Sequence, residues 1–176
     1  MAKLKHLSLR EEIIETCLKM NEEGINQGTS GNVSARIDGG FLITASGVPY
    51  HKMKPHHIVE MDLEGRYVGD YLPSTEWRMH MDIFKRRAEA GAIVHTHSIY
   101  PTALACLRKD IPPFHYMIGI GGGTTIRCSD YAEFGTQALS DVMLKALEDR
   151  SACLLGNHGQ IAFGPNLEKA LWRAGE

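Results

Sequence analysis

Two histidines separated by one residue, His95 and His97, are the first side chains in this sequence that point to chemistry. They fall in the apolar run AIVHTH, which has the composition of a buried strand. Side chains two residues apart on a strand project from the same face of a sheet, so both imidazoles can reach one metal ion. The pair alone is a weak signal, because buried histidines satisfied by hydrogen bonds are common.

A third imidazole, His158, lies in the loop GNHG between two short apolar runs. The glycines of this loop let the backbone turn sharply and present the side chain. Three histidines leave one position open on a four-coordinate zinc ion, which is the arrangement of catalytic zinc sites rather than structural ones. The histidines therefore predict a metal site that can also bind a substrate.

An acidic residue, Glu76, follows Ser74 and Thr75 where a helix is expected to begin. Free backbone N–H groups and the helix dipole favour negative charge there, so a carboxylate that stabilises the helix start is the simpler interpretation of this position. His80 lies four residues later and can share a helix face with Glu76. A Glu–His metal pair is therefore an alternative, although a surface contact is the commoner meaning of this spacing.

Three turns carry groups that can bind an anion. The loop GTSGN at residues 28–32 offers hydroxyls, an amide and backbone N–H groups that glycines allow to converge, although a simple connecting turn is an equally good interpretation. The turns at Ser46-Gly47 and Ser74-Thr75 add further hydroxyls, and the second of them precedes a helix N-terminus. Together the three turns make a phosphate-binding site plausible.

The elements that must position these residues alternate irregularly between helix and strand. Helical patterns and their end signals cover residues 8–23, 75–90, 101–109, 139–147 and 167–176, with a Ser8–Glu11 capping box at the first and Asn166 as the cap of the last. Strand patterns cover residues 33–37, 41–45, 58–62, 66–69, 92–97, 124–128, 152–155 and 160–163.

The order of these elements predicts the fold class. Strands outnumber helices, tight turns join many of them, and the regular alternation of a doubly wound fold is missing. We therefore predict an α/β fold with α/β/α layers around a mostly antiparallel central sheet. No repeat or linker-like stretch interrupts the sequence, which predicts one domain over residues 1–176. The last helical pattern has no terminator, which we interpret as a missing C-terminal tail.

Composition narrows the class of partner. A formal net charge of −2 with interspersed charges predicts no nucleic-acid partner and no binding to anionic membranes, so a small molecule is the expected ligand. The sequence has no run of eighteen apolar residues and no secretory leader pattern, which predicts a cytoplasmic protein without membrane spans. The four cysteines form no C-x-x-C pair and are expected to be reduced thiols.

Seven segments jointly resemble the class II aldolase/adducin family: NQGTSGNVS, FLITASGVPY, LPSTEWRMH, VHTHS, HYMI, YAEFGT and NHG. The resemblance runs from about Arg10 to Ala174. It implies the α/β fold of that family and the activity of a metal-dependent aldolase, a carbon–carbon lyase. The reaction implied is zinc-dependent retro-aldol cleavage of L-fuculose 1-phosphate, or a closely related ketose 1-phosphate, to dihydroxyacetone phosphate and a short aldehyde such as L-lactaldehyde.

The same resemblance implies the metal centre. His95, His97 and His158 would be ligands of one zinc ion per subunit. Glu76 would be a further ligand of the resting metal and the acid/base of the reaction.

The resemblance also implies how substrate is bound. Tyr116 would act in catalysis across a subunit boundary of a four-fold symmetric homotetramer, and Phe134 would line the aldehyde side of the site. The phosphate-binding residues implied are Gly31, Asn32, Ser46, Gly47, Ser74 and Thr75.

Other activities on the same fold remain open from the sequence. They are an aldolase for another deoxypentulose 1-phosphate, a sugar-phosphate 4-epimerase and a decarboxylase. The epimerases have aspartate where this chain has Glu76, which favours the aldolase. A non-enzymatic adducin-like module is expected to lack the three histidines, so their presence favours an enzyme.

Overall fold

A seven-stranded sheet runs through the computed structural model, which describes residues 4–176; the first three residues of the predicted domain lie outside it. The strand order is β4-β3-β2-β1-β5-β7-β6, and every neighbouring pair is antiparallel. The strands are β1 (Asn32–Ile37), β2 (Gly40–Thr44), β3 (Ile58–Asp62), β4 (Tyr67–Val68), β5 (Ala92–Thr96), β6 (Ala152–Leu155) and β7 (Gly159–Gly164).

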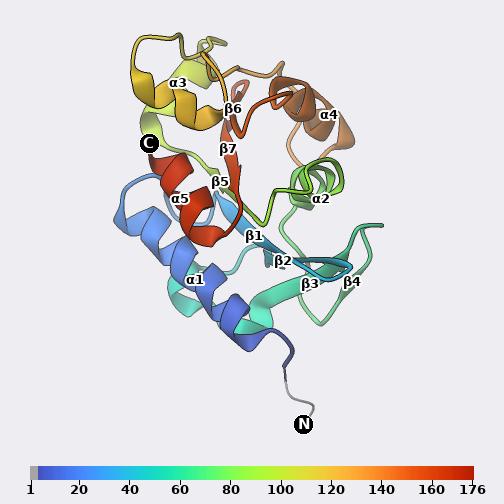
Figure 1. Ribbon diagram of the computed structural model, residues 1–176. Coiled ribbons are helices and arrows are strands. Elements are labelled where there is room, and N and C mark those ends of the chain that lie inside the picture. The colour runs from blue at the N-terminus through green and yellow to red at the C-terminus, as the bar shows by residue number, and fades with distance from the viewer. Residues whose placement is uncertain (1–3) are drawn as a thin grey trace.

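Helices cover both faces of this sheet (Figure 1). Helices α1 (Leu7–Glu22) and α5 (Leu167–Gly175) lie on one face, and α2 (Trp77–Arg86) and α4 (Gln137–Ala146) on the other. Helix α3 (Ile99–Cys106) packs beside β6 and β7, and short 3-10 helices span Tyr50–Lys52, Pro55–His57 and Tyr116–Gly121. The predicted α/β/α layers around an antiparallel sheet are confirmed. Over residues 4–176, none of the helices combines the length and apolar character needed to cross a membrane.

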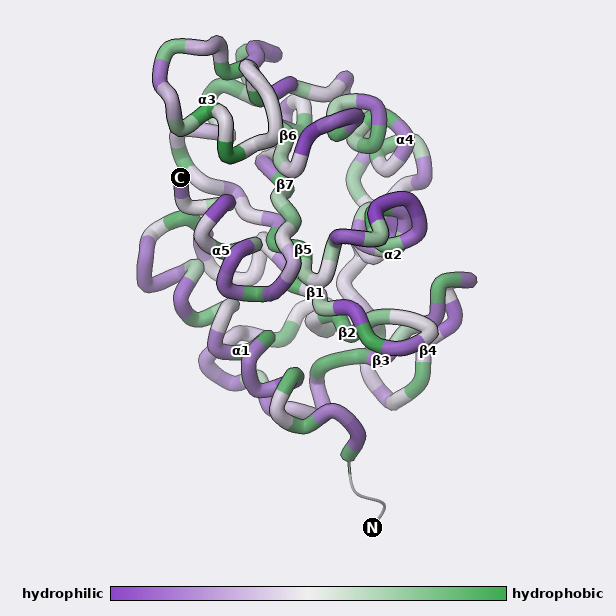
Figure 2. The backbone as a smooth tube through the Cα atoms, viewed as in Figure 1, coloured by the Kyte–Doolittle hydropathy of each residue, from purple (hydrophilic) through white to green (hydrophobic). Residues whose placement is uncertain are grey.

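Each face of the sheet supplies one of two hydrophobic cores. Successive residues of a strand point to opposite faces, so Leu42 joins the core under α1 and α5, and Ile43 joins the core under α2 and α4. Val94 and Ile93 divide in the same way on β5. The central strands are therefore apolar on both faces, and Figure 2 shows β5 and β7 as mostly hydrophobic between helices of mixed character.

Two local predictions are wrong. Helix α1 begins at Leu7, so Ser8 lies inside it and donates to Glu12 across 3.3 Å instead of capping the helix. Residues 124–128 form no strand, because this segment makes only the isolated bridges Ile111–Ile126 and Cys128–Leu154. Ser8 does not cap because the helix begins one residue before it, with His6 as the N-cap residue. The 124–128 segment meets its partners only at single bridges, and Leu154 is a partner that short-range signals do not specify.

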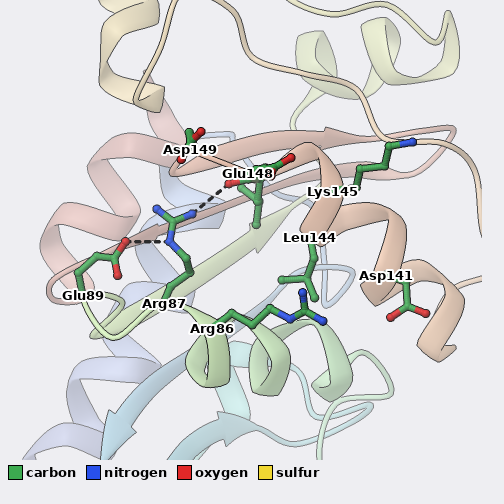
Figure 3. Close-up of a pocket in the computed structure, with 9 residues that line it drawn as sticks. Arg86, Arg87, Glu89, Asp141, Leu144, Lys145, Glu148 and Asp149 are labelled. Atoms are coloured by element: carbon green, nitrogen blue, oxygen red, sulfur yellow. Dashed lines mark hydrogen bonds and ion pairs between the residues drawn. The ribbon is translucent and has the colours of Figure 1, made fainter.

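Arg87, the residue after α2, ties the end of that helix to the end of α4 (Figure 3). Its Nη1 donates to the carbonyl oxygens of Leu147 and Arg150 across 3.0 and 2.7 Å, and its Nε donates to Glu89 across 2.8 Å. The guanidinium also lies over the Phe163 ring, 4.7 Å from its centroid. These contacts anchor the C-terminal end of α2, and with it the direction in which the N-terminal end of the helix points.

Candidate metal centre

Four side chains from separate parts of the fold meet at one point above the sheet. Glu76 is the residue before α2, His95 lies in β5, His97 follows the end of β5, and His158 lies in the turn between β6 and β7. One ligand atom from each lies within 4.8 Å of the others. The Nε2 atoms of His95 and His97 are 3.1 Å apart, and the Glu76 carboxylate lies 3.1 Å from His95 and 3.0 Å from His158.

The backbone fixes which nitrogen of His95 faces the cluster. Its Nδ1 lies 2.7 Å from the carbonyl oxygen of Gln160, so Nδ1 carries the hydrogen and Nε2 of the neutral ring has a lone pair. That lone pair points at His97 Nε2 and at a Glu76 oxygen. Electron-rich atoms converge here, and a cation at their centre would contact all of them.

The spacing of the cluster fits a metal ion. Zinc–ligand bonds of about 2.0–2.1 Å in a tetrahedral site place neighbouring ligand atoms about 3.3 Å apart, close to the distances above. Glu76 Oε1 is buried and, among the described residues, makes no hydrogen bond, although His158 Nε2 lies 3.0 Å away. A separation of 3.0 Å between this oxygen and this nitrogen also suits two ligands of one shared ion.

Electrostatics favour an ionised Glu76 and a neutral His97. Burial raises the pKa of Glu76, but the charge and N–H groups of His95 and His158 outweigh it and hold that pKa well below its ordinary value. Burial, together with the neighbouring imidazoles, lowers the pKa of His97 to about 4. Burial also acts to lower the pKa of His95, but the Glu76 carboxylate raises it overall. At neutral pH the cluster therefore offers an ionised carboxylate and a neutral His97.

The structure corrects both local interpretations of Glu76 and His80. Glu76 does not cap its helix with its side chain; its carboxylate is buried and turned toward the histidines. His80 is fully buried, so it makes no surface contact, and it does not belong to the metal cluster. Its ring lies between Ser34 and Asn32, with Nδ1 2.6 Å from Ser34 Oγ and Nε2 2.6 Å from Asn32 Oδ1.

A small polar cavity of about 70 Å³ adjoins the cluster, because Glu76 lines both. Backbone hydrogen bonds from Ser46 to Leu72 and from Ser74 to Thr44, across 3.0 and 2.9 Å, join two of the turns that enclose it. All six residues predicted to bind phosphate line this cavity: Gly31, Asn32, Ser46, Gly47, Ser74 and Thr75. The three turns that are far apart in sequence therefore meet beside the carboxylate.

Two predicted site residues lie elsewhere. Among the described residues, neither Tyr116 nor Phe134 joins the cluster or lines the cavity, and their side chains are 84% and 63% exposed. The loop that carries Phe134 does approach the cavity wall, because Arg78 donates to the Gly135 carbonyl oxygen across 2.7 Å. The backbone of this loop also packs closely on Thr75, because a Cβ at Gly135 would lie 3.0 Å from the Thr75 carbonyl oxygen.

Several residues that support the site carry no sequence signal of their own. The Asn26 side-chain oxygen accepts from the backbone N–H of His97 across 3.3 Å and from Ser30 Oγ across 3.1 Å. The Tyr50 hydroxyl donates to the carbonyl oxygen of Gly31. The residue types of Asn26 and Tyr50 carry no signal until the fold shows which backbone groups their side chains reach.

Gly31 lies against the metal-binding strand, and we expect Gly31→Ala to damage the site. The new Cβ would lie 2.4 Å from the His95 carbonyl oxygen and 2.8 Å from Asn26 Oδ1, so β1 and β5 must move apart. We expect a loss of about 1–3 kcal/mol in the free energy of unfolding, together with weaker metal binding. Urea unfolding and metal content measure both effects.

Gly175→Ala is the matched control, because a Cβ there meets no atom of the described chain within 4 Å. Unchanged stability and metal content in the Gly31 variant would contradict the close approach.

Comparison with known proteins identifies the family of this chain. Residues 11–176 match the model of the family described as the class II aldolase and adducin N-terminal domain. L-fuculose phosphate aldolase of Escherichia coli strain K12 is 49% identical over 168 residues, covering 96% of this chain and 78% of that protein. The 5-methylthioribulose-1-phosphate/5-deoxyribulose-1-phosphate aldolase of Rhodospirillum rubrum is 46% identical over 165 residues, covering 94% and 75%.

A solved structure of L-fuculose 1-phosphate aldolase shares the fold, with a TM-score of 0.93 at 38% identity. It covers 99% of this chain, which spans 82% of that one. The family match, the related sequences and the fold agree: this chain belongs to the class II aldolase and adducin family.

Proposed function

We propose that this protein is a zinc-dependent aldolase that cleaves L-fuculose 1-phosphate to dihydroxyacetone phosphate and L-lactaldehyde. The observation that carries the proposal is the cluster of three imidazoles and one carboxylate beside a small polar cavity. The similarity to L-fuculose phosphate aldolases supports the substrate. The proposed ligands of one zinc ion per subunit are Glu76, His95, His97 and His158.

The residues of the chain divide the reaction between two neighbouring regions. The hydroxyls and backbone N–H groups around the cavity bind the phosphate and thereby orient the sugar chain toward the cluster. The proposed phosphate-binding residues are Gly31, Asn32, Ser46, Gly47, Ser74 and Thr75. Zinc bound in the cluster supplies Lewis-acid stabilisation of the negative charge that develops as C3–C4 breaks.

Two proton transfers complete the reaction. The C4 hydroxyl loses its proton as the aldehyde forms, and Tyr116 of a neighbouring subunit is proposed to take it. Glu76, whose Oε1 faces the cluster without a hydrogen bond, is proposed to take a proton from solvent once the substrate displaces it and to deliver that proton to C3, while Tyr116 passes the C4 proton on to solvent, so that both groups are regenerated. Phe134 is proposed to contact the aldehyde portion of the substrate.

The role of Tyr116 requires a second subunit, and we propose a homotetramer with the site at a subunit interface. Exposed apolar side chains on and after α3 support such an interface: Ile99 is 61%, Tyr100 85% and Phe114 74% exposed. Light scattering of the purified protein measures the assembly. A cytoplasmic location, predicted from the sequence, remains part of the proposal.

A second candidate substrate is a deoxypentulose 1-phosphate, favoured by the similarity to the Rhodospirillum rubrum aldolase. Cleavage of 5-deoxyribulose 1-phosphate also releases dihydroxyacetone phosphate and differs only in the aldehyde. Both candidates therefore need the same metal cluster and phosphate cavity.

A coupled assay for dihydroxyacetone phosphate tests the proposal with both substrates. We expect release from L-fuculose 1-phosphate that stops after treatment with a chelator and returns with added zinc. Larger kcat/KM for 5-deoxyribulose 1-phosphate would assign the second substrate instead. Zinc-loaded protein that releases no dihydroxyacetone phosphate from either compound would refute the aldolase.

A further inference from the structure

We propose that Ser34 and His80 are positioning residues that fix the orientation of the Asn32 amide, and through it the carboxylate of Glu76. The four side chains form an unbroken chain: Ser34 Oγ to His80 Nδ1, 2.6 Å; His80 Nε2 to Asn32 Oδ1, 2.6 Å; Asn32 Nδ2 to Glu76 Oε2, 2.9 Å. The inference rests on the proposed function, because Glu76 is the group whose position matters.

This row of four hydrogen-bonded side chains forms because the spacing of same-face residues on a strand nearly matches the spacing of residues four apart on a helix. Asn32 and Ser34 are two residues apart on β1, which separates same-face side chains by about 6.8 Å. Glu76 and His80 are four residues apart at the start of α2, a rise of about 6 Å. The two pairs therefore interlock when α2 packs on the sheet, although Asn32 and His80 are 48 residues apart in sequence.

The donors and acceptors of the four side chains fix the direction of each hydrogen bond between them. The Glu76 carboxylate only accepts, so the Asn32 NH₂ must face it and the Asn32 oxygen must face His80. That oxygen requires a hydrogen on His80 Nε2, which leaves Nδ1 of the neutral ring to accept from the Ser34 hydroxyl. The opposite amide orientation would place two acceptors together, the Asn32 oxygen and the Glu76 carboxylate.

Burial makes the wrong orientation costly. The exposed fractions are 0% for Ser34 and His80, 3% for Asn32 and 6% for Glu76. In such a low-dielectric environment, unmatched donors and acceptors are strongly unfavourable. The chain therefore anchors one carboxylate oxygen, Oε2, and leaves the other, Oε1, as the oxygen without a hydrogen bond that faces His158.

Breaking these hydrogen bonds is expected to let the Glu76 carboxylate move, although all four proposed metal ligands stay in place. We expect His80→Phe to release zinc into excess chromophoric chelator about tenfold faster or more, because partners that orient metal ligands typically contribute 10–100-fold. We expect kcat to fall by a similar factor and KM to change less, because His80 does not line the phosphate cavity and orients only Asn32 among the proposed phosphate-binding residues. His80→Gln retains an N–H donor for Asn32 and should restore much of both properties.

Ser34→Ala tests the same chain with a smaller change. It removes the hydroxyl that holds the His80 ring through Nδ1, and we expect faster zinc release in the same direction. Ser140→Ala is the matched control, because Ser140 is also fully buried but donates to Asp82 and makes no hydrogen bond to Ser34, His80, Asn32 or Glu76. Its zinc release and kcat should equal those of the parent protein.

The outcomes separate this inference from the proposed function. Folded His80→Phe with unchanged zinc release and kcat would overturn the positioning role; if that variant fails to fold, unchanged zinc release in Ser34→Ala overturns it. Faster zinc release in both variants, with the parent protein inactive on both sugar phosphates, would support the positioning role while the aldolase assignment fails.

Discussion

Glu76→Gln should lose turnover and keep its metal. The amide is nearly the same size as the carboxylate, and its oxygen can still accept from Asn32 Nδ2, which now lies 2.9 Å from Oε2. The three histidines that complete the cluster remain in place. An amide cannot carry a proton to C3, and removal of a general acid or base typically lowers the rate by about 10²–10⁴-fold.

The measurement for Glu76→Gln is kcat in the dihydroxyacetone phosphate assay, alongside zinc content by atomic absorption. Glu89→Gln makes the same chemical change at a side chain that is 60% exposed and paired with Arg87, and it should retain full activity. Full turnover by the Glu76 variant would falsify its role as proton donor. Loss of zinc with loss of turnover would show instead that the carboxylate acts mainly as a ligand.

His97→Ala should remove both metal and activity. His97 lies beyond the end of β5 and is only partly buried, so its truncation leaves the strand and its hydrogen bonds intact. His95, in contrast, is fully buried and bonded to the Gln160 carbonyl oxygen, so its loss would mix effects on metal and stability. Lewis-acid stabilisation is worth several kcal/mol, so we expect a loss in kcat/KM of roughly a thousandfold or more.

Metal stoichiometry and thermal unfolding of the metal-free protein distinguish the two possible causes of inactivity in His97→Ala. We expect little bound zinc and a nearly unchanged unfolding temperature without metal. His51→Ala is the control, because His51 is exposed in a 3-10 helix and lies outside the cluster. Zinc retained at full stoichiometry in the His97 variant would exclude His97 as a ligand.

The sequence by itself determined most of the strands, the α4 and α5 helices and the antiparallel layered fold. These depend on local signals, such as the turn after Ile37, the apolar stripe of α4, the Asn166 cap and the apolar strand β5. The H-x-H spacing also indicated, from strand geometry alone, that His95 and His97 could meet at one ion, and their Nε2 atoms lie 3.1 Å apart.

Only the tertiary structure decided what Glu76, His80 and Asn32 do. By position, Glu76 is a helix-start carboxylate and His80 a surface neighbour, but packing of α2 on β1 buries both and joins them through Asn32. The Glu76–Asn32 contact spans 44 residues. Spacing along the chain specifies which side chains share a face of one element, whereas the packing of whole apolar faces decides which elements meet.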